Sequence, residues 1–137
     1  MTRLGLGSAP LGGLFQAVTD DEAHRVIEAA WQAGIRFFDT APQYGNGLAE
    51  QRLGAVLSTK PREQFVLATK VGRLLRAGAP PQSDTFPGAP PLNPVYDFSY
   101  DGVMHSVEES VSRLGIDRID ILHIHDCLLY TSDAADE

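Results

Sequence analysis

The sequence has little positive charge, a single cysteine and no long apolar run. Eleven Lys and Arg residues stand against eighteen Asp and Glu residues among 137, a formal net charge of -7. This acidic balance argues against nucleic acid or an anionic membrane as the main partner. The single cysteine, Cys127, excludes an internal disulfide and a cysteine-based metal cluster. No apolar run approaches the ~20 residues that cross a bilayer, and the N-terminus lacks the pattern of a secretion signal. We therefore expect a cytoplasmic protein that binds neither nucleic acid nor membrane.

Residues 127–137, CLLYTSDAADE, differ from the rest of the chain. They follow an apolar, strand-like run without turn residues, periodicity or a capping pattern. One reverse translation of this stretch resembles the adapter of a DNA-sequencing library, so we interpret it as a foreign tail; an ordinary acidic tail is the alternative. Residues 1–126 are then expected to be the front part of a longer protein.

Short apolar runs and helical patterns alternate along residues 1–126. Contiguous apolar residues, typical of strands covered on both faces, predict buried strands over 4–9, 35–39, 65–70 and 119–125. Capping residues and apolar residues at helical spacing predict helices from Thr19 to Gly34, over 48–57, and from Ser99 to Gly115. The segment 71–98 holds six of the nine prolines and has no periodicity, so it is predicted to be a long loop.

This alternation indicates a parallel sheet with right-handed crossovers, either open and doubly wound or closed into a barrel. The segment Gly5–Pro10 matches only the first two glycines of a dinucleotide-binding fingerprint, because Pro10 occupies the third position. Asp39, Lys70 and His125 end successive predicted strands, where barrel enzymes carry their chemistry. The predicted fold is therefore α/β, the N-terminal half of a (β/α)8 barrel truncated after the fourth strand. Such a half barrel would leave two strand edges unpaired, so we expect this chain alone to aggregate and to have little activity.

Four reactive side chains are expected to meet at the rim of this barrel, since Tyr44 follows Asp39 by five residues. A phenol in water has a pKa of about 10, and a nearby ammonium group favours its ionised form. Tyr44 beside Lys70 is thus a candidate for proton exchange with a substrate oxygen, with Asp39 holding Lys70 and His125 orienting that oxygen. None of these groups supplies two electrons, so a redox cofactor is required. Taken singly, Asp39 could be a turn former, Tyr44 a loop aromatic and Lys70 a solvated lysine.

Two histidines allow a different chemistry. His123 and His125 share one face of a predicted strand, as a metal-ligating pair would. Zinc usually takes three or four ligands, and no further His or Cys is predicted at this rim. A metal-dependent barrel hydrolase therefore stays an alternative. His24 and His105 fall within predicted helices and are expected to be surface or packing residues.

The combination of motifs resembles the aldo-keto reductase family. Residues 34–54, GIRFFDTAPQYGNGLAEQRLG, are similar to the family segment that contains its Asp and Tyr. Residues 65–73, FVLATKVGR, are similar to the strand that bears its Lys, and residues 118–126, RIDILHIHD, to the strand that ends in its His. The resemblance covers essentially all of residues 1–126, with the motifs in the family's order.

This resemblance implies a barrel that binds NAD or NADP without a Rossmann fold. It implies Asp39, Tyr44, Lys70 and His125 as catalytic residues, and Gly7, Ser8, Ala9 and Asp39 beside the cofactor, with no metal. The Pro-rich insertion and the segments around it resemble the subgroup of D-threo-aldose and pyridoxal dehydrogenases. That subgroup implies hydride transfer between nicotinamide and a small aldose hemiacetal, alcohol or carbonyl substrate. A non-catalytic, nicotinamide-binding regulatory subunit of the same family is a further alternative. The residues that separate NAD from NADP belong to later strands of the family.

Overall fold

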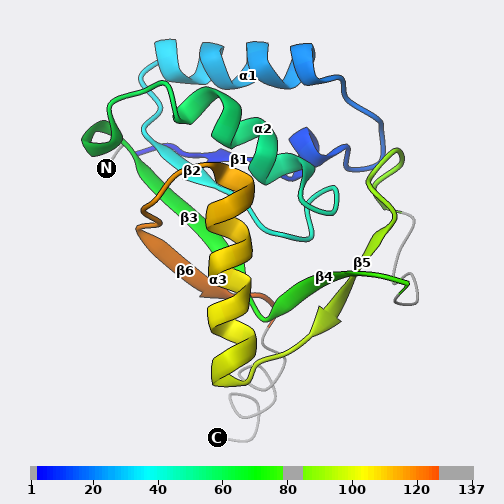
Figure 1. The fold of residues 1–137 in the computed structure, drawn as a ribbon. Coiled ribbons are helices and arrows are strands. Elements are labelled where there is room, and N and C mark those ends of the chain that lie inside the picture. Colours follow the sequence, from blue (N-terminus) through cyan, green and yellow to red (C-terminus); the bar gives the residue numbers. More distant parts are fainter. Residues whose placement is uncertain (1–2, 79–84, 127–137) are drawn as a thin grey trace, which may run out of the picture.

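The computed structural model describes residues 3–78 and 85–126 and contains one sheet of four parallel strands. The strands lie in the order β1 (Leu6–Gly7), β2 (Phe37–Asp39), β3 (Val66–Val71) and β6 (Ile121–Ile124). Three helices connect them and form a second layer on one face: α1 (Asp20–Gln32), α2 (Leu48–Leu57) and α3 (Tyr100–Leu114) (Figure 1). This is the N-terminal half of a (β/α)8 barrel, as the strand and helix pattern predicted.

The helix ends follow the capping residues of the sequence. At the start of α1, the Thr19 hydroxyl accepts a hydrogen bond from the backbone N–H of Glu22, and the Glu22 carboxylate accepts one from the backbone N–H of Thr19. The Ser99 hydroxyl accepts the backbone N–H of Gly102 at the start of α3, and Gly115 ends that helix in the left-handed conformation. These local signals explain why the predicted helix boundaries agree closely with the observed ones.

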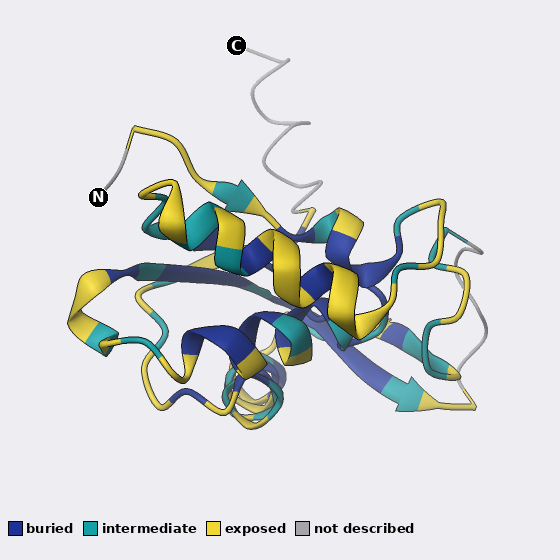
Figure 2. Ribbon diagram, turned by 90° about the horizontal axis from the view of Figure 1, so that it is seen from above, coloured by how far each residue is buried: buried dark blue, intermediate teal, exposed yellow. Residues whose placement is uncertain are grey.

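The hydrophobic core lies between the sheet and the helices, where Figure 2 shows the buried faces. It contains Ile27 of α1, Leu53 of α2 and Leu67 of β3, together with Phe38 of β2. Apolar residues at helical spacing are not all buried in these helices. Val26 is exposed on α1, and the most deeply buried residues of α3 are Gly102, Ser106, Ser110 and Leu114 rather than its valines.

Close helix packing explains the small buried residues. A Cβ added at Gly54 of α2 would lie only 2.0 Å from the carbonyl oxygen of Leu114, so α2 and the end of α3 are in backbone contact. Small side chains on both helices permit this approach, and the larger valines of α3 are left half-buried at its sides. Helical spacing alone does not indicate which side of the apolar stripe meets the neighbouring helix.

The prediction of one long loop over 71–98 is wrong. Two strands within it, β4 (Arg73–Ala77) and β5 (Leu92–Tyr96), form an antiparallel hairpin. Leu74 and Leu75 of β4 are buried, which provides the apolar packing that holds the hairpin. Pro94 is tolerated because both strands of a two-stranded sheet are edge strands. A further short element, a 3-10 turn at Ala9–Gly12, begins where no helix was predicted.

The first and last strands of the sheet, β1 and β6, have free outer edges within the described part of the chain. β1 is shorter than the predicted strand over 4–9, and β6 is shorter than that over 119–125. Leu122 and Ile124 of β6 are exposed, which is the exposure expected of an open half barrel. The tail predicted to be foreign, 127–137, lies outside the described residues. None of the described helices is long and apolar enough to cross a membrane.

Candidate active site

The carboxyl ends of two neighbouring parallel strands bring two opposite charges together. Asp39 is the last residue of β2, and Lys70 is the penultimate residue of the neighbouring β3. The Lys70 ammonium donates hydrogen bonds to both carboxylate oxygens of Asp39, at 3.0 and 2.8 Å, and to the backbone oxygen of Thr40 at 3.0 Å. These contacts fix the position of the Lys70 ammonium on the sheet edge. The expectation that Asp39 holds Lys70 agrees with this geometry.

Tyr44 lies against the same ammonium group. It belongs to the loop between β2 and α2, and its ring centroid is 4.9 Å from Lys70 Nζ. His125, just beyond β6, meets the Tyr44 ring edge-on, with 5.9 Å between the ring centroids. The structure therefore brings together all four residues that the sequence singled out: a phenol, an ammonium, a carboxylate and an imidazole.

Two glycines determine where the Tyr44 loop lies. A Cβ added at Gly12 would be 2.5 Å from the carbonyl carbon of Tyr44, and one added at Gly45 would be 2.3 Å from the carbonyl oxygen of Gly12. The backbones of the two loops are thus in direct contact, at a distance that side chains would prevent. The carbonyl oxygen of Tyr44 also accepts the backbone N–H of Ala49, at 3.1 Å, which ties the loop to α2.

His125 is held as a neutral imidazole. It is 7% exposed, and this burial lowers its pKa to about 4; the neighbouring Arg73 guanidinium acts in the same direction and Asp126 opposes it. Its Nδ1 has no hydrogen-bond partner within residues 3–78 and 85–126. Near pH 7 this ring is therefore uncharged and retains one N–H donor.

Arg73 connects His125 to the hairpin. Its guanidinium forms an ion pair with Asp126, the residue that follows His125, and lies 4.9 Å from the ring centroid of Tyr96 on β5. Arg73 is the first residue of β4 and directly follows Gly72, against which the Phe98 ring packs. No sequence signal indicated this role, because Arg73 lies in the segment that was predicted to be a loop.

A buried carboxylate lies beneath the site. Glu50 of α2 is 0% exposed, accepts the Thr69 hydroxyl at 2.7 Å, and accepts Arg113 Nε of α3 at 2.5 Å. Thr69 precedes Lys70, so this network joins α2, β3 and α3 directly behind the Asp39–Lys70 pair. Sequence reasoning missed it, although a signal was present: Glu50 lies three and seven residues before Leu53 and Leu57, on the apolar face of α2.

The residues expected beside a cofactor have different environments. Gly7 and Asp39 are paired in register and line a groove on the inner face of the sheet, together with His123. No atom outside its chain neighbours lies within 4 Å of a Cβ built on Gly7, so this part of the groove is open. Ser8 is fully buried and its backbone N–H donates to the carbonyl oxygen of Asp39 at 2.9 Å, while Ala9 is half-buried.

The alternative metal site lacks ligands in the described part of the chain. His123 is exposed and lies opposite Lys70 in the strand register, whereas His125 is buried against Tyr44. Within residues 3–78 and 85–126, no group of three or more His, Cys, Asp or Glu side chains is arranged to hold a metal ion.

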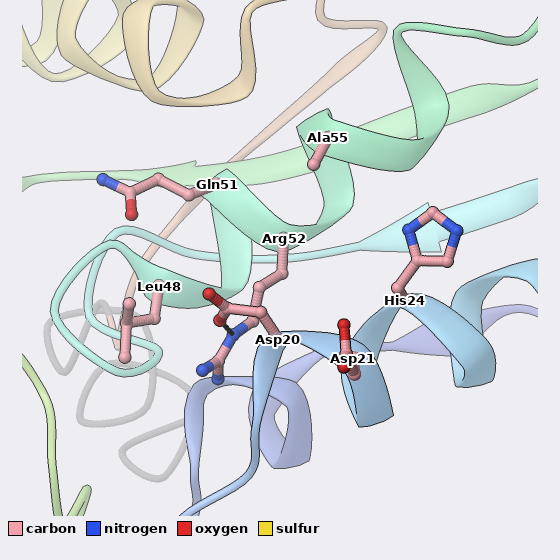
Figure 3. Close-up of a pocket in the computed structure, with 7 residues that line it drawn as sticks. All are labelled: Asp20, Asp21, His24, Leu48, Gln51, Arg52 and Ala55. Carbon is pink, nitrogen blue, oxygen red and sulfur yellow. Dashed lines mark hydrogen bonds and ion pairs between the residues drawn. The ribbon is translucent and has the colours of Figure 1, made fainter.

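A separate hollow lies on the outer helical layer, between α1 and α2 (Figure 3). Arg52 occupies it and donates hydrogen bonds to Asp20 at 2.8 Å, to the backbone oxygen of Leu11 at 2.5 Å and to that of Val18 at 2.8 Å. These bonds fix the loop before α1. His24 borders the hollow and is exposed, as is His105 on α3. Of the surface or packing positions expected for these two histidines, both occupy the surface.

An α/β half barrel with Asp, Tyr, Lys and His side chains at the carboxyl ends of its strands has the arrangement found in barrel enzymes. Comparison with known proteins identifies the family: the chain belongs to the aldo/keto reductase family, whose pattern matches residues 3–135. It is 54% identical over 129 residues to D-threo-aldose 1-dehydrogenase from Pseudomonas, covering 90% of this chain and 39% of that protein. It is 48% identical over 142 residues to pyridoxal 4-dehydrogenase from Microbacterium luteolum, covering 92% of this chain and 40% of that protein.

The fold comparison agrees with the sequence comparison. An aldo-keto reductase from Bacillus halodurans, solved in its holo form, superposes with a TM-score of 0.70 at 28% identity, covering 97% of this chain and 40% of that one. The chain thus spans about two fifths of the length of these relatives. The similarity to the aldose and pyridoxal dehydrogenases agrees with the subgroup resemblance of the insertion and the strand motifs.

Proposed function

We propose that this chain provides the catalytic part of an NAD- or NADP-dependent oxidoreductase that acts on a small aldose hemiacetal, alcohol or carbonyl substrate. One observation carries the proposal: Lys70 Nζ, bonded to Asp39, lies 4.9 Å from the centroid of the Tyr44 ring, and His125 meets the same ring. Family membership supports a nicotinamide cofactor, and the names of the two dehydrogenases support an aldose or a related cyclic compound as substrate.

Two of the residues proposed to hold the cofactor, Gly7 and Asp39, line the groove on the inner face of the sheet. Gly7 leaves open space, and the Asp39 carboxylate borders the same groove, so Gly7 and Asp39 would contact the nicotinamide ribose. Ser8 and Ala9 would contribute by shaping the end of β1, because the Ser8 side chain is buried. When bound, a nicotinamide nucleotide provides or accepts the hydride that no side chain of this site can supply.

The side chains of the site would then transfer the proton of the substrate hydroxyl and orient the substrate oxygen. In oxidation, the Tyr44 phenolate oxygen accepts the proton of the substrate hydroxyl and becomes a phenol. In reduction, the Tyr44 phenol donates that proton to the carbonyl oxygen. Lys70 provides positive charge beside the phenol, and Asp39 keeps the ammonium in place. Neutral His125 donates an N–H to the substrate oxygen, which orients it without placing a second charge in the pocket.

A hybrid barrel tests this function. Residues 1–126 are joined to the C-terminal part of the Pseudomonas D-threo-aldose 1-dehydrogenase, and the absorbance of reduced nicotinamide is followed with NAD and with NADP over a panel of aldoses. Turnover that requires both aldose and cofactor is the expected result. Cofactor binding without turnover of any aldose, alcohol or aldehyde would overturn the proposal and favour a regulatory subunit.

A further inference from the structure

The Pro-rich insertion contributes an aromatic ring to the candidate site. Phe86, in the connection between β4 and β5, lies with its ring centroid 6.4 Å from that of Tyr44, at an interplanar angle of 37°. Its ring is half-buried. Tyr44 is thus bordered by Lys70, by His125 and by Phe86, and of these three only Phe86 is apolar and flat.

Backbone contacts fix the position of this part of the insertion. The backbone N–H of Phe15 donates to the carbonyl oxygen of Thr85 at 2.8 Å, next to Phe86. On the other side, the Asn46 side-chain amide donates to the carbonyl oxygens of Pro90, at 3.0 Å, and of Leu92. The segment is therefore bonded both to the loop that precedes α1 and to the Tyr44 loop itself. These bonds hold the backbone on both sides of Phe86.

We propose that Phe86 is a specificity residue that selects six-membered ring substrates over open-chain ones; this inference rests on the proposed function. If the Tyr44 hydroxyl exchanges a proton with the reacting oxygen, the carbon skeleton attached to that oxygen lies beside Tyr44, where Phe86 is the apolar neighbour. A pyranose presents a flat face of C–H groups that covers an aromatic ring well. A short aliphatic aldehyde has no such face and gains little from the same ring.

The role differs from that of the aromatic residues that hold the hairpin together. Phe98 stacks on Tyr96 and packs against Gly72, so its ring supports the hairpin's own structure. Phe86 packs instead across to the loop that carries the proposed proton donor. A pocket that is mostly apolar with a few placed polar groups is the usual form of a small-molecule site, and Phe86 would supply its apolar side.

The test uses the hybrid barrel with three variants at this position and one matched control. Phe86→Ala removes the ring, Phe86→Leu keeps apolar volume without a flat face, and Phe86→Tyr restores the face. Phe15→Ala is the control, since its ring is 80% exposed and it is linked to the insertion by its backbone N–H. kcat and KM are measured for oxidation of an aldopyranose and for reduction of a short aliphatic aldehyde.

Phe86→Ala and Phe86→Leu are each expected to raise KM for the aldopyranose about 2- to 10-fold, with kcat changed less. The aldehyde is expected to be affected less than twofold, Phe86→Tyr to behave as the parent, and Phe15→Ala to change neither substrate. Equal losses for both substrates would indicate a purely structural role and overturn the inference, as would an unchanged KM for the aldopyranose.

Failure of the proposed function gives a different result. In that case the unsubstituted hybrid turns over neither substrate, and ring recognition is measured by ligand-observed NMR with a methyl pyranoside and with glycerol as the open-chain comparison. Binding of the pyranoside that weakens in Phe86→Ala and not in Phe15→Ala supports the inference. Equal binding by both variants overturns it.

Discussion

Removing the Glu50 carboxylate is expected to cost this chain a large part of its stability. The carboxylate is 0% exposed and accepts hydrogen bonds from Thr69 at 2.7 Å and Arg113 at 2.5 Å. Glu50→Ala would leave the Arg113 charge mostly buried and without its main partner. Removing one member of a buried ion pair costs about 3–5 kcal/mol.

The lower part of this range applies here. The Arg113 side chain is 15% exposed, and it keeps a second carboxylate, that of Glu109, at 3.7 Å. We therefore expect Glu50→Ala to lower the free energy of unfolding by about 3 kcal/mol, a large share of the 5–15 kcal/mol typical of a whole domain. The double variant Glu50→Leu/Arg113→Met is expected to be more stable than either single variant, because it leaves no unpaired charge.

Urea unfolding of the hybrid barrel, followed by the fluorescence of Trp31, measures this effect, because this chain alone is expected to aggregate. Trp31 is the sole tryptophan of the chain and packs against Phe38 and Phe65 of the core, so its emission reports loss of tertiary structure. Glu109→Gln is the control, since Glu109 is a partly exposed partner of Arg76 at 2.8 Å and its removal is expected to cost at most about 1 kcal/mol. A loss below about 1 kcal/mol for Glu50→Ala would refute the reasoning.

Two further predictions concern groups that touch the site. Arg73→Gln removes a positive charge beside His125 and frees Asp126, so the pKa of His125 should rise above about 4, measured by NMR titration. The pKa of His125 in the folded protein lies below its ordinary value, so the stability due to neutral His125 is complete above about pH 6.5 and is lost as pH falls towards 4. Arg73→Gln should reduce this loss of stability at low pH. A His125 titration that Arg73→Gln leaves unchanged would contradict the prediction. Gly12→Ala should displace the Tyr44 loop, since its Cβ would lie 2.5 Å from the Tyr44 carbonyl carbon, and unaltered Tyr44 resonances would count against this contact.

The parallel sheet and the helix ends were predictable because their signals are local. Thr19, Ser99 and Gly115 mark helix boundaries through capping bonds that involve nearby backbone groups. The convergence of Asp39, Lys70 and His125 was also predictable from the sequence, because parallel strands direct their carboxyl ends to one rim.

The hairpin and the contacts that it makes were not predictable from the pattern. β4 and β5 are held by packing of Leu74 and Leu75 and by pairing across residues far apart in the chain, and the prolines around them suggest a loop. The position of Phe86 beside Tyr44 depends on that hairpin. Residue spacing contains no information on such long-range approaches.

The most direct test of the account is the Tyr44→Phe variant of the hybrid barrel, in which turnover and cofactor binding are measured on the same sample. Loss of the phenolic oxygen should lower oxidation of an aldose by about 100- to 10,000-fold, because the substrate hydroxyl loses the group that accepts its proton. The dissociation constant of the nicotinamide nucleotide, measured by quenching of protein fluorescence, should change less than about twofold, since the aromatic ring at position 44 and its neighbours remain. Turnover equal to that of the parent hybrid would contradict the assignment of Tyr44 as the group that exchanges the proton.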